Sequence, residues 1–224
     1  GFHGTSHTYV SKKTAEFLHK PLSETNCIVM HLGNGSSLSC TKNGKCLDTS
    51  MGLTPLEGMI MGTRCGTLDP AIVPFIMKKK GFTPEEMDTL MNKKSGLQAL
   101  CGSADMRDVH KERENGNKRA ELAFRMLVHG IKKILGSYFF LLGGKVDAVT
   151  FTAGIGEHDE LVRAAVMEGL EGIGFKLDPE ANRARKSGAR VISAPDSRIP
   201  ILVIPTNEEL QIAETAVEVV SKNK

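Results

Sequence analysis

The sequence lacks several features that would assign a protein to a class at once. No apolar run among its 224 residues approaches the ~20 residues of a transmembrane helix, so we expect no membrane span. Its 29 Lys and Arg residues against 26 Asp and Glu residues leave a formal net charge of +3. That balance argues against a protein held to nucleic acid by a basic face. Internal repeats and low-complexity segments are also absent.

The cysteines indicate neither a disulfide framework nor a zinc site. There are five of them, an odd number, and no two have C-x-x-C spacing. A chain of this size can bury a core of its own, so it needs neither kind of cross-link. We therefore expect reduced thiols and a cytoplasmic location.

The beginning of the chain lacks an initiator Met, a signal peptide and a transit pattern. It reads Gly-Phe-His-Gly over residues 1–4. We therefore expect the 224 residues to be part of a longer protein.

Short β-rich runs predict the strands. They cover residues 27–32, 36–41, 45–49, 146–152, 190–193 and 199–204. Asn43 and Gly44 separate two of these runs and predict a hairpin with a type I′ turn, which needs positive φ at both central residues. The fully apolar runs indicate strands that are covered on both faces.

Capping signals and apolar spacing predict the helices. Thr83 and Pro84 followed by Glu86 predict a helix start with a capping box. Apolar residues at helical spacing predict the longest helix over residues 118–141, and a further helix over residues 156–169. A second capping box over residues 206–209 predicts a helix through Val220. The order of elements favours an α/β fold with a mixed sheet.

Two glycine-rich turns that follow apolar strands are candidate ligand sites. The first consists of His31, Leu32, Gly33, Asn34 and Gly35. The second consists of Gly154, Ile155, Gly156, Glu157 and His158. Glycine lets the backbone approach a ligand closely, and successive N–H groups or a helix N-terminus attract phosphate. A plain tight connection is the alternative for each turn, and for a single G-x-G it is the more common explanation, so both interpretations stay open.

The known phosphate-binding patterns are incomplete in both turns. A third glycine of G-x-G-x-x-G would stand where Leu38 and Asp159 stand. The G-x-x-x-x-G-K-[ST] pattern and the protein-kinase signatures are absent. If this chain binds phosphates, it does so through neither a Rossmann motif nor a P-loop motif.

Polar residues near the first turn are further candidates. His3 and His7 are four residues apart, but two nearby glycines and the lack of a third ligand disfavour a metal site. A turn that carries His donors suits an oxyanion or phosphate better. Arg64 stands among small residues and is suited to reach a phosphoryl group, although an ion pair with Asp69 is an alternative.

Two more segments allow two interpretations each. Asp105, Met106 and Arg107 form either a polar helix start with a local ion pair or a nucleotide contact. Glu208 is either a helix-cap residue or, beside a phosphate-bound Mg²⁺, a metal ligand.

Together these segments resemble the C-terminal half of the acetokinase family, the ATP-dependent kinases of short-chain acids. The matching segments follow the family order and span the chain: residues 1–7 (Gly-Phe-His-Gly-Thr-Ser-His), 31–37 (His-Leu-Gly-Asn-Gly-Ser-Ser), 48–58, 61–64 (Met-Gly-Thr-Arg), 151–157 (Phe-Thr-Ala-Gly-Ile-Gly-Glu) and 205–209 (Pro-Thr-Asn-Glu-Glu). The resemblance implies an actin-like and sugar-kinase-like, ribonuclease-H-like nucleotide-binding domain with a mixed sheet flanked by helices.

The resemblance also implies roles for the candidate residues. The 31–35 turn would contact the ATP phosphates, and the segments 105–107 and 154–158 would border the adenosine. His3 and Arg64 match positions that stabilise the transferring phosphoryl group, and Glu208 matches a Mg²⁺ ligand. This set of parts suits phosphoryl transfer, which needs positioning and charge stabilisation more than covalent chemistry.

The chain departs from the family pattern in two ways. His158 stands where the family usually has Asn, and we expect nucleotide binding to survive the change. The family's N-terminal half, with its phosphate loop, acid-binding Arg and catalytic Asp, is not in this chain. The resemblance divides the chain into a nucleotide-binding domain over residues 1–206 and a terminal helix over residues 207–224. That helix is expected to pack on the missing half.

The function expected from the resemblance is the reversible, Mg²⁺-dependent phosphorylation of acetate by ATP to acetyl phosphate and ADP. The 224 residues alone are expected to be inactive. A homodimer is expected, with no nucleic-acid or membrane partner. The alternatives are a propionate or butyrate kinase of the same family and a non-catalytic nucleotide-binding module. A dinucleotide-dependent oxidoreductase is disfavoured by the incomplete glycine patterns.

Overall fold

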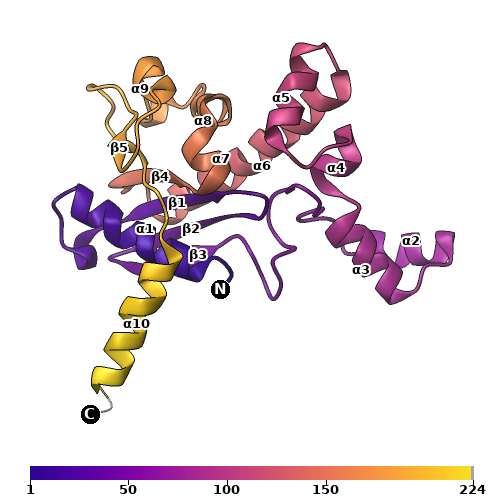
Figure 1. Ribbon diagram of the computed structural model, residues 1–224, viewed down its shortest axis with the longest axis horizontal. Helices are drawn as coiled ribbons and strands as arrows, with labels where there is room; N and C mark the ends of the chain where they lie inside the picture. Colours follow the sequence, from indigo (N-terminus) through magenta and orange to yellow (C-terminus); the bar gives the residue numbers. More distant parts are fainter. Residues whose placement is uncertain (223–224) are drawn as a thin grey trace.

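A six-stranded mixed sheet forms the centre of the computed structural model, which describes residues 1–222 (Figure 1). The strand order is β3-β2-β1-β4-β6-β5. Strands β1, β4 and β6 run parallel, whereas β2, β3 and β5 run antiparallel to their neighbours. The bounds are β1 Cys27–Leu32, β2 Ser36–Lys42, β3 Lys45–Thr49, β4 Ala148–Thr152, β5 Arg190–Val191 and β6 Ile201–Val203. The six predicted strands are confirmed, and the last pair is shorter than predicted.

The two faces of β1 are buried against different helices, which explains why every residue of the strand is buried. Ile28 and Met30 belong to a core shared with helix α6 (Lys118–Leu141). Cys27 and Val29 belong to a second core with Val10 of helix α1 (Gly4–Phe17). Successive side chains of a strand point to opposite faces, so a strand between two helical layers has no solvent-facing side. The prediction of an α/β fold with a mixed sheet flanked by helices is confirmed.

The remaining helices lie between the hairpin and β4, or follow β4. They are α2 (Ile72–Lys80), α3 (Pro84–Lys93), α4 (Gly96–Cys101), α5 (Met106–Glu114), α7 (Ala153–His158), α8 (Glu160–Met167), α9 (Pro179–Arg183) and α10 (Glu208–Lys222), with 3-10 turns at Leu22–Glu24 and Glu171–Ile173. Figure 1 shows helices α2 to α5 as an arm that extends away from the sheet. Within residues 1–222, no helix has the length and apolar character needed to cross a membrane.

Local capping and turn signals were reliable predictors. The side chain of Thr83 accepts from the backbone of Glu86, and the Glu86 side chain closes the capping box of α3. Asn43 and Gly44 have φ of 52° and 71°, as the predicted hairpin turn requires. The helix over residues 118–141 begins and ends as predicted.

Three local predictions were wrong. The segment from His3 to His7 is not a turn: helix α1 begins at Gly4, and His3 precedes it in the left-handed region with a φ of 57°. The helix predicted over residues 156–169 begins earlier and is broken at Asp159, whose backbone is extended and whose side chain caps α8. The cap of α10 is Asn207, which accepts from the backbone N–H of Leu210 at 2.9 Å, and not Thr206.

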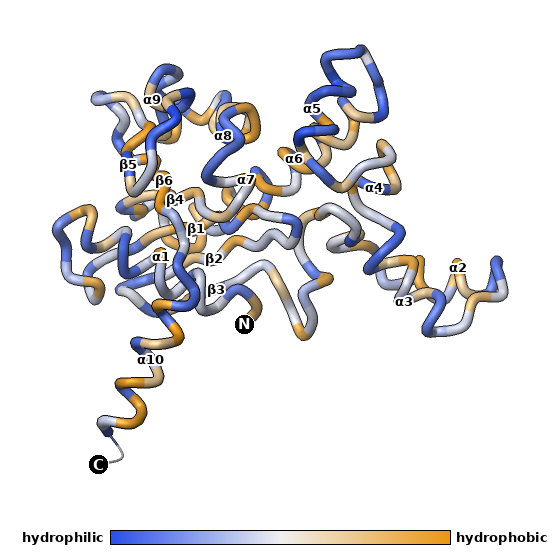
Figure 2. Tube along the Cα trace, viewed as in Figure 1, coloured by the Kyte–Doolittle hydropathy of each residue, from blue (hydrophilic) through white to orange (hydrophobic). Residues whose placement is uncertain are grey.

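Helix α10 projects from the body and contains several apolar residues (Figures 1 and 2). Val217 is 67 % exposed and Val220 is 56 % exposed, and Gln211 is the one buried residue of this helix. Its first turns lie against α1, where Lys12 and Glu214 approach to 3.9 Å. The predicted packing of residues 207–224 on another part of the protein stays a prediction, and its last two residues lie outside the described ones.

Candidate active site

The two glycine-rich turns meet at one edge of the sheet. Strands β1 and β4 are parallel neighbours, with His31 paired to Thr152, so the turns that follow them leave the sheet side by side. A Cβ placed on Gly33 would lie 3.9 Å from the Cβ of Ala153. The carboxyl ends of adjacent parallel strands are a common place for ligand sites in α/β proteins. The topology therefore brings together two segments that lie about 120 residues apart in the sequence.

A cavity of about 760 Å³ opens beside these turns. Such a volume is typical of small-molecule sites. One wall is the start of α5, and the other is formed by α7 and the start of α8. Eight of the residues predicted from the sequence line it: Gly33, Asn34, Asp105, Met106, Arg107, Gly154, Ile155 and His158. A larger hollow of about 1310 Å³ lies over α6 and α8, but none of the predicted residues lines that one.

Five predicted residues of the two turns do not line the cavity. His31 and Leu32 are the buried end of β1. A Cβ on Gly156 would lie 3.4 Å from the backbone of Phe151, so this glycine allows α7 to pack closely on β4. Glu157 lies in α7 and points back to the start of this helix, where its Oε1 accepts from the backbone N–H of Ala153 at 3.0 Å. Gly35 belongs to a second group of residues next to the cavity.

That second group, here called the strand-end cluster, consists of His3, His7, His31, Ser37 and Arg64. Arg64 and His3 converge on Gly35: a Cβ placed there would lie 3.1 Å from Arg64 Nη1 and 3.5 Å from His3 Nε2. The absence of a side chain at Gly35 therefore leaves a cradle between a guanidinium and an imidazole. Such a pair of donors suits an anion.

Arg64 is not engaged by a carboxylate. Its Nη1 lies 3.4 Å from Pro55 O and 3.6 Å from Met61 Sδ. Among residues 1–222, no acidic side chain forms an ion pair with it, and Asp69 instead accepts from the backbone N–H of Ala71. The alternative of an Arg64–Asp69 ion pair is therefore wrong. The guanidinium is available to an anionic ligand.

Hydrogen bonds to serine hydroxyls hold the histidines of the cluster. His3 Nδ1 and His7 Nε2 each lie 2.8 Å from Ser37 Oγ. The rings of His3 and His31 stack with centroids 4.0 Å apart. Burial lowers the pKa of His7 to about 3 and that of His31 to about 4, with the neighbouring imidazoles as the smaller cause. Burial, and then the charge of Arg64, lowers the pKa of His3. All three rings are therefore neutral near pH 7.

Glu208 stands at the exposed start of α10, and this helix start is tied to the strand-end cluster. Ser6 Oγ lies 2.8 Å from both Thr206 Oγ1 and His31 Nδ1. Within the described part of the chain, no three His, Cys, Asp or Glu side chains are grouped to hold a metal ion. Glu208 can thus contribute a single carboxylate, which fits a Mg²⁺ that keeps most of its ligands from phosphate and water.

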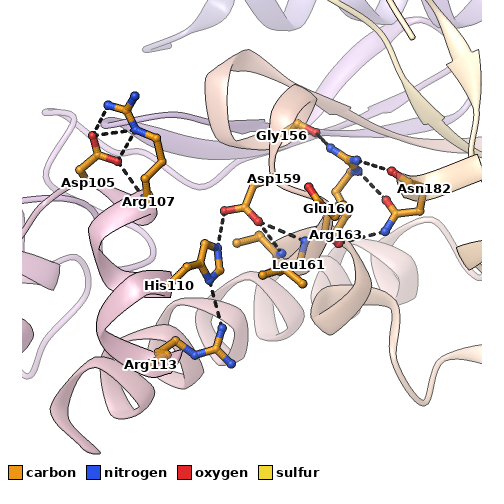
Figure 3. A network of polar contacts seen from close by, with 11 residues as sticks. Asp105, Arg107, His110, Arg113, Gly156, Asp159, Glu160, Leu161, Arg163 and Asn182 are labelled. Atoms are coloured by element: carbon orange, nitrogen blue, oxygen red, sulfur yellow. Dashed lines mark hydrogen bonds and ion pairs between the residues drawn. The ribbon is translucent and has the colours of Figure 1, made fainter. Parts of the chain in front are cut away.

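The walls of the cavity contain a polar network that the sequence did not predict (Figure 3). His110 Nδ1 accepts from Arg113, so its Nε2–H donates to Asp159 Oδ2 at 2.8 Å and joins the two walls. Behind them the buried Arg163 donates to Gly156 O at 2.9 Å and to Asn182 Oδ1 at 2.7 Å. Apart from the contact between His110 and Arg113 within α5, these contacts join different elements, so no motif signals them.

The segment at residues 105–107 forms the predicted polar helix start with a local ion pair, and its nucleotide contact stays a prediction. Asp105 caps α5 by accepting from the backbone N–H of Arg107 at 2.9 Å, and the side chains of the two residues form an ion pair. These contacts hold the pKa of the Asp105 carboxyl at about 2. Both residues also line the cavity.

Comparisons with known proteins agree with this arrangement. The sequence model of the acetokinase family matches residues 1–214. The chain is 69% identical over 222 residues to an acetate kinase of Desulfovibrio desulfuricans, covering 99% of this chain and 55% of that protein. It is 55% identical over 223 residues to an acetate kinase of Campylobacter jejuni, covering 100% of this chain and 56% of the relative. The chain thus spans about half the length of the curated relatives it matches.

Solved structures give the same result. The crystal structure of Porphyromonas gingivalis acetate kinase matches with a TM-score of 0.94 at 41% identity, over 98% of this chain and 55% of that one. A propionate kinase from Francisella tularensis matches with a TM-score of 0.88 at 42% identity, over 95% of this chain and 54% of that one. The expected fold class, actin-like and sugar-kinase-like, is confirmed. Its motifs, its fold and these matches show that the chain belongs to the acetokinase family.

Proposed function

We propose that the full-length protein transfers a phosphoryl group between ATP and a short-chain carboxylate, with acetate as the first candidate acid. The observation that carries this proposal is the convergence of Arg64 and His3 on Gly35, next to a cavity of about 760 Å³. Relatives that match nearly the whole chain are named acetate kinases. The reaction is reversible and forms acetyl phosphate and ADP.

The cavity accepts the nucleoside of ATP. Residues 105–107 of one wall and residues 154–158 of the other border the adenosine, and the apolar Met106 and Ile155 supply surface for a base. The phosphates extend toward the 31–35 turn. Gly33 and Asn34 line the cavity, and Gly35 lies next to Arg64. A nucleotide that follows this path ends with its terminal phosphate at the strand-end cluster.

Arg64 and His3 stabilise the phosphoryl group during transfer. The loose transition state of phosphoryl transfer spreads negative charge over equatorial oxygens, and a fixed guanidinium offsets that charge. His3 is neutral, so it acts as a hydrogen-bond donor and adds no second positive charge beside Arg64. Because both groups are held by the fold before the reaction, little reorganisation is needed in the transition state.

Glu208 is the residue of this chain that would hold Mg²⁺. The metal supplies charge neutralisation on the phosphates when it is bound. A single carboxylate suits this role because Mg²⁺ bound to a nucleotide takes most of its ligands from phosphate and water. The link from Thr206 through Ser6 to His31 keeps the start of α10 beside the strand-end cluster.

The acid-binding Arg and the catalytic Asp lie outside these 224 residues, so we infer that the chain alone binds nucleotide and turns over nothing. Residues 207–224 pack on the rest of the protein, which accounts for the exposed valines of α10. The full-length protein is a cytoplasmic homodimer without nucleic-acid or membrane partners. The five free thiols suit a reducing compartment, and Phe140 on α6, which is 82 % exposed, suits a subunit contact.

A propionate or butyrate kinase is the second candidate. The chain is as similar to the propionate kinase structure as to the acetate kinase structure, at 42% and 41% identity. A coupled assay of ADP release by the full-length protein, with acetate, propionate and butyrate, separates the candidates. We expect the highest kcat/KM with acetate. A higher value with propionate or butyrate would assign the other acid, and nucleotide binding without transfer to any of the three would indicate a non-catalytic module.

A further inference from the structure

A row of hydrogen bonds runs from the interior of the sheet to His3. Ser39 Oγ lies 2.8 Å from His7 Nδ1, His7 Nε2 lies 2.8 Å from Ser37 Oγ, and Ser37 Oγ lies 2.8 Å from His3 Nδ1. Ser37 is fully buried, and Ser39 and His7 are 2 % and 7 % exposed. Water therefore has little access to these groups, and they satisfy their hydrogen bonds with one another.

Counting protons shows that the tautomers of His3 and His7 depend on each other. Both rings are neutral near pH 7, so each carries one N–H. Ser37 contacts a ring nitrogen of each, and its hydroxyl has a single proton. It can donate to one ring only and must accept from the other. When His3 accepts at Nδ1, His7 must donate from Nε2, and both rings then carry their proton on Nε2.

The anion site proposed over Gly35 selects this direction of the row over the opposite one. In the opposite direction, His3 Nε2 would present a lone pair beside Gly35. A lone pair cannot donate to an anion seated there and repels it. In the selected direction His3 presents an N–H, and an anion seated over Gly35 would accept from both His3 and Arg64.

We propose that Ser39, His7 and Ser37 fix His3 as the Nε2–H tautomer and so aim an N–H donor at the anion cradle over Gly35. Ser37 and His7 are positioning residues, because they act through His3. The stacked ring of His31 restrains the tilt of the same imidazole. The inference rests on the proposed function, in which His3 faces the transferring phosphoryl group.

The direct test is the tautomer itself. In full-length protein labelled with ¹⁵N-histidine, the ring nitrogen shifts distinguish protonated from unprotonated nitrogens, and His3→Gln and His7→Gln variants assign the signals. We expect both His3 and His7 to carry the proton on Nε2 near pH 7. A proton on Nδ1 of His3, or opposite tautomers in the two rings, would overturn the proposal. The ¹⁵N measurement does not require the protein to be catalytically active.

Kinetics then test whether the row matters for the reaction. Ser37→Ala should lower kcat about 10-fold while changing KM for ATP less than about threefold. His3→Ala should lower kcat further, because it removes the donor itself. His7→Gln keeps an amide N–H toward Ser37, whereas His7→Met fills a similar volume without a donor. We expect the Gln variant to recover most of the kcat that the Met variant loses.

A matched control is Ser11→Ala. Ser11 is also buried on α1, but its hydroxyl has no hydrogen-bond partner in the described structure. This variant should leave kcat unchanged. Equal kcat in the Gln and Met variants, or an unchanged kcat in Ser37→Ala, would contradict the positioning role even if the protein is a kinase. Absence of kinase activity in the unmodified protein would contradict the proposed function instead. The tautomer measurement would still show whether His3 carries its proton on Nε2.

Discussion

The strand-end cluster and the cavity next to it are built in opposite ways. In the cluster, buried side chains from α1, β1 and β2 contact one another. The single hydroxyl of Ser37, for example, contacts both His3 and His7. In the cavity, the walls come from separate helices and carry exposed side chains such as Arg107, and His110 and Asp159 join them. We infer that the cluster tolerates little change because its groups depend on one another, whereas substitutions in the cavity act separately.

The largest effect is expected from Arg64→Ala. Arg64 is the cationic group at Gly35, and the proposed function makes it a transition-state arginine. The variant should lower kcat by a factor of about 10³ or more, with a smaller change in KM for ATP. Steady-state assays of the full-length protein measure both constants. A normal kcat would remove Arg64 from the proposed mechanism.

A smaller but still large effect is expected from Gly35→Ala. The added Cβ would lie 3.1 Å from Arg64 Nη1 and would occupy the cradle. We expect kcat to fall by a factor of about 10². Gly136→Ala on α6 is the control, because a Cβ there meets nothing within 4 Å. If the two variants kept the same kcat, Gly35 would not mark the position of the reacting group.

A moderate effect, on binding alone, is expected from His110→Ala. The change removes the hydrogen bond to Asp159 that joins the two cavity walls, so the base should be held less tightly. KM for ATP should rise about threefold to tenfold with kcat nearly unchanged. Glu114→Ala, at the exposed end of the same helix, should change neither constant. A fall in kcat without a change in KM would mean that the two regions are not separate.

The smallest effect is expected from Arg107→Ala. The side chain of Arg107 is 90 % exposed and already paired with Asp105. Exposed ion pairs contribute little, so KM for ATP should change less than about threefold. Nucleotide titration of the variant checks this value. A loss of binding as large as in the His110 variant would make Arg107 a principal nucleotide contact.

Local sequence patterns predicted the parts of both regions but not how those parts are connected. The Asn43-Gly44 turn, the Thr83 cap and the glycine-rich turn after β1 depend on residues close in sequence, and all three lie where expected. Residues 154–158, predicted as a turn, lie in helix α7 instead. Helix α1 was missed because the glycine and serine residues at its start are typical of a turn. The break at Asp159 was missed because its side chain caps α8 within a continuous apolar pattern.

Contacts between distant residues were beyond prediction from one sequence. The bond from Ser37 to His3 spans 34 residues, and that from His110 to Asp159 spans 49. Their pairing follows from the sheet order and from the helix positions, which short motifs do not encode. The family resemblance identified His3 and Arg64 individually, and the structure adds that both approach Gly35.

The most direct test of this account is a crystal structure of the full-length protein with a non-hydrolysable ATP analogue. We expect the base between residues 105–107 and 154–158, and the terminal phosphate over Gly35, within hydrogen-bond distance of Arg64 and of His3 Nε2. A nucleotide bound in the hollow over α6 and α8, or a terminal phosphate remote from Gly35, would contradict the proposal that Arg64 and His3 contact the transferring phosphoryl group.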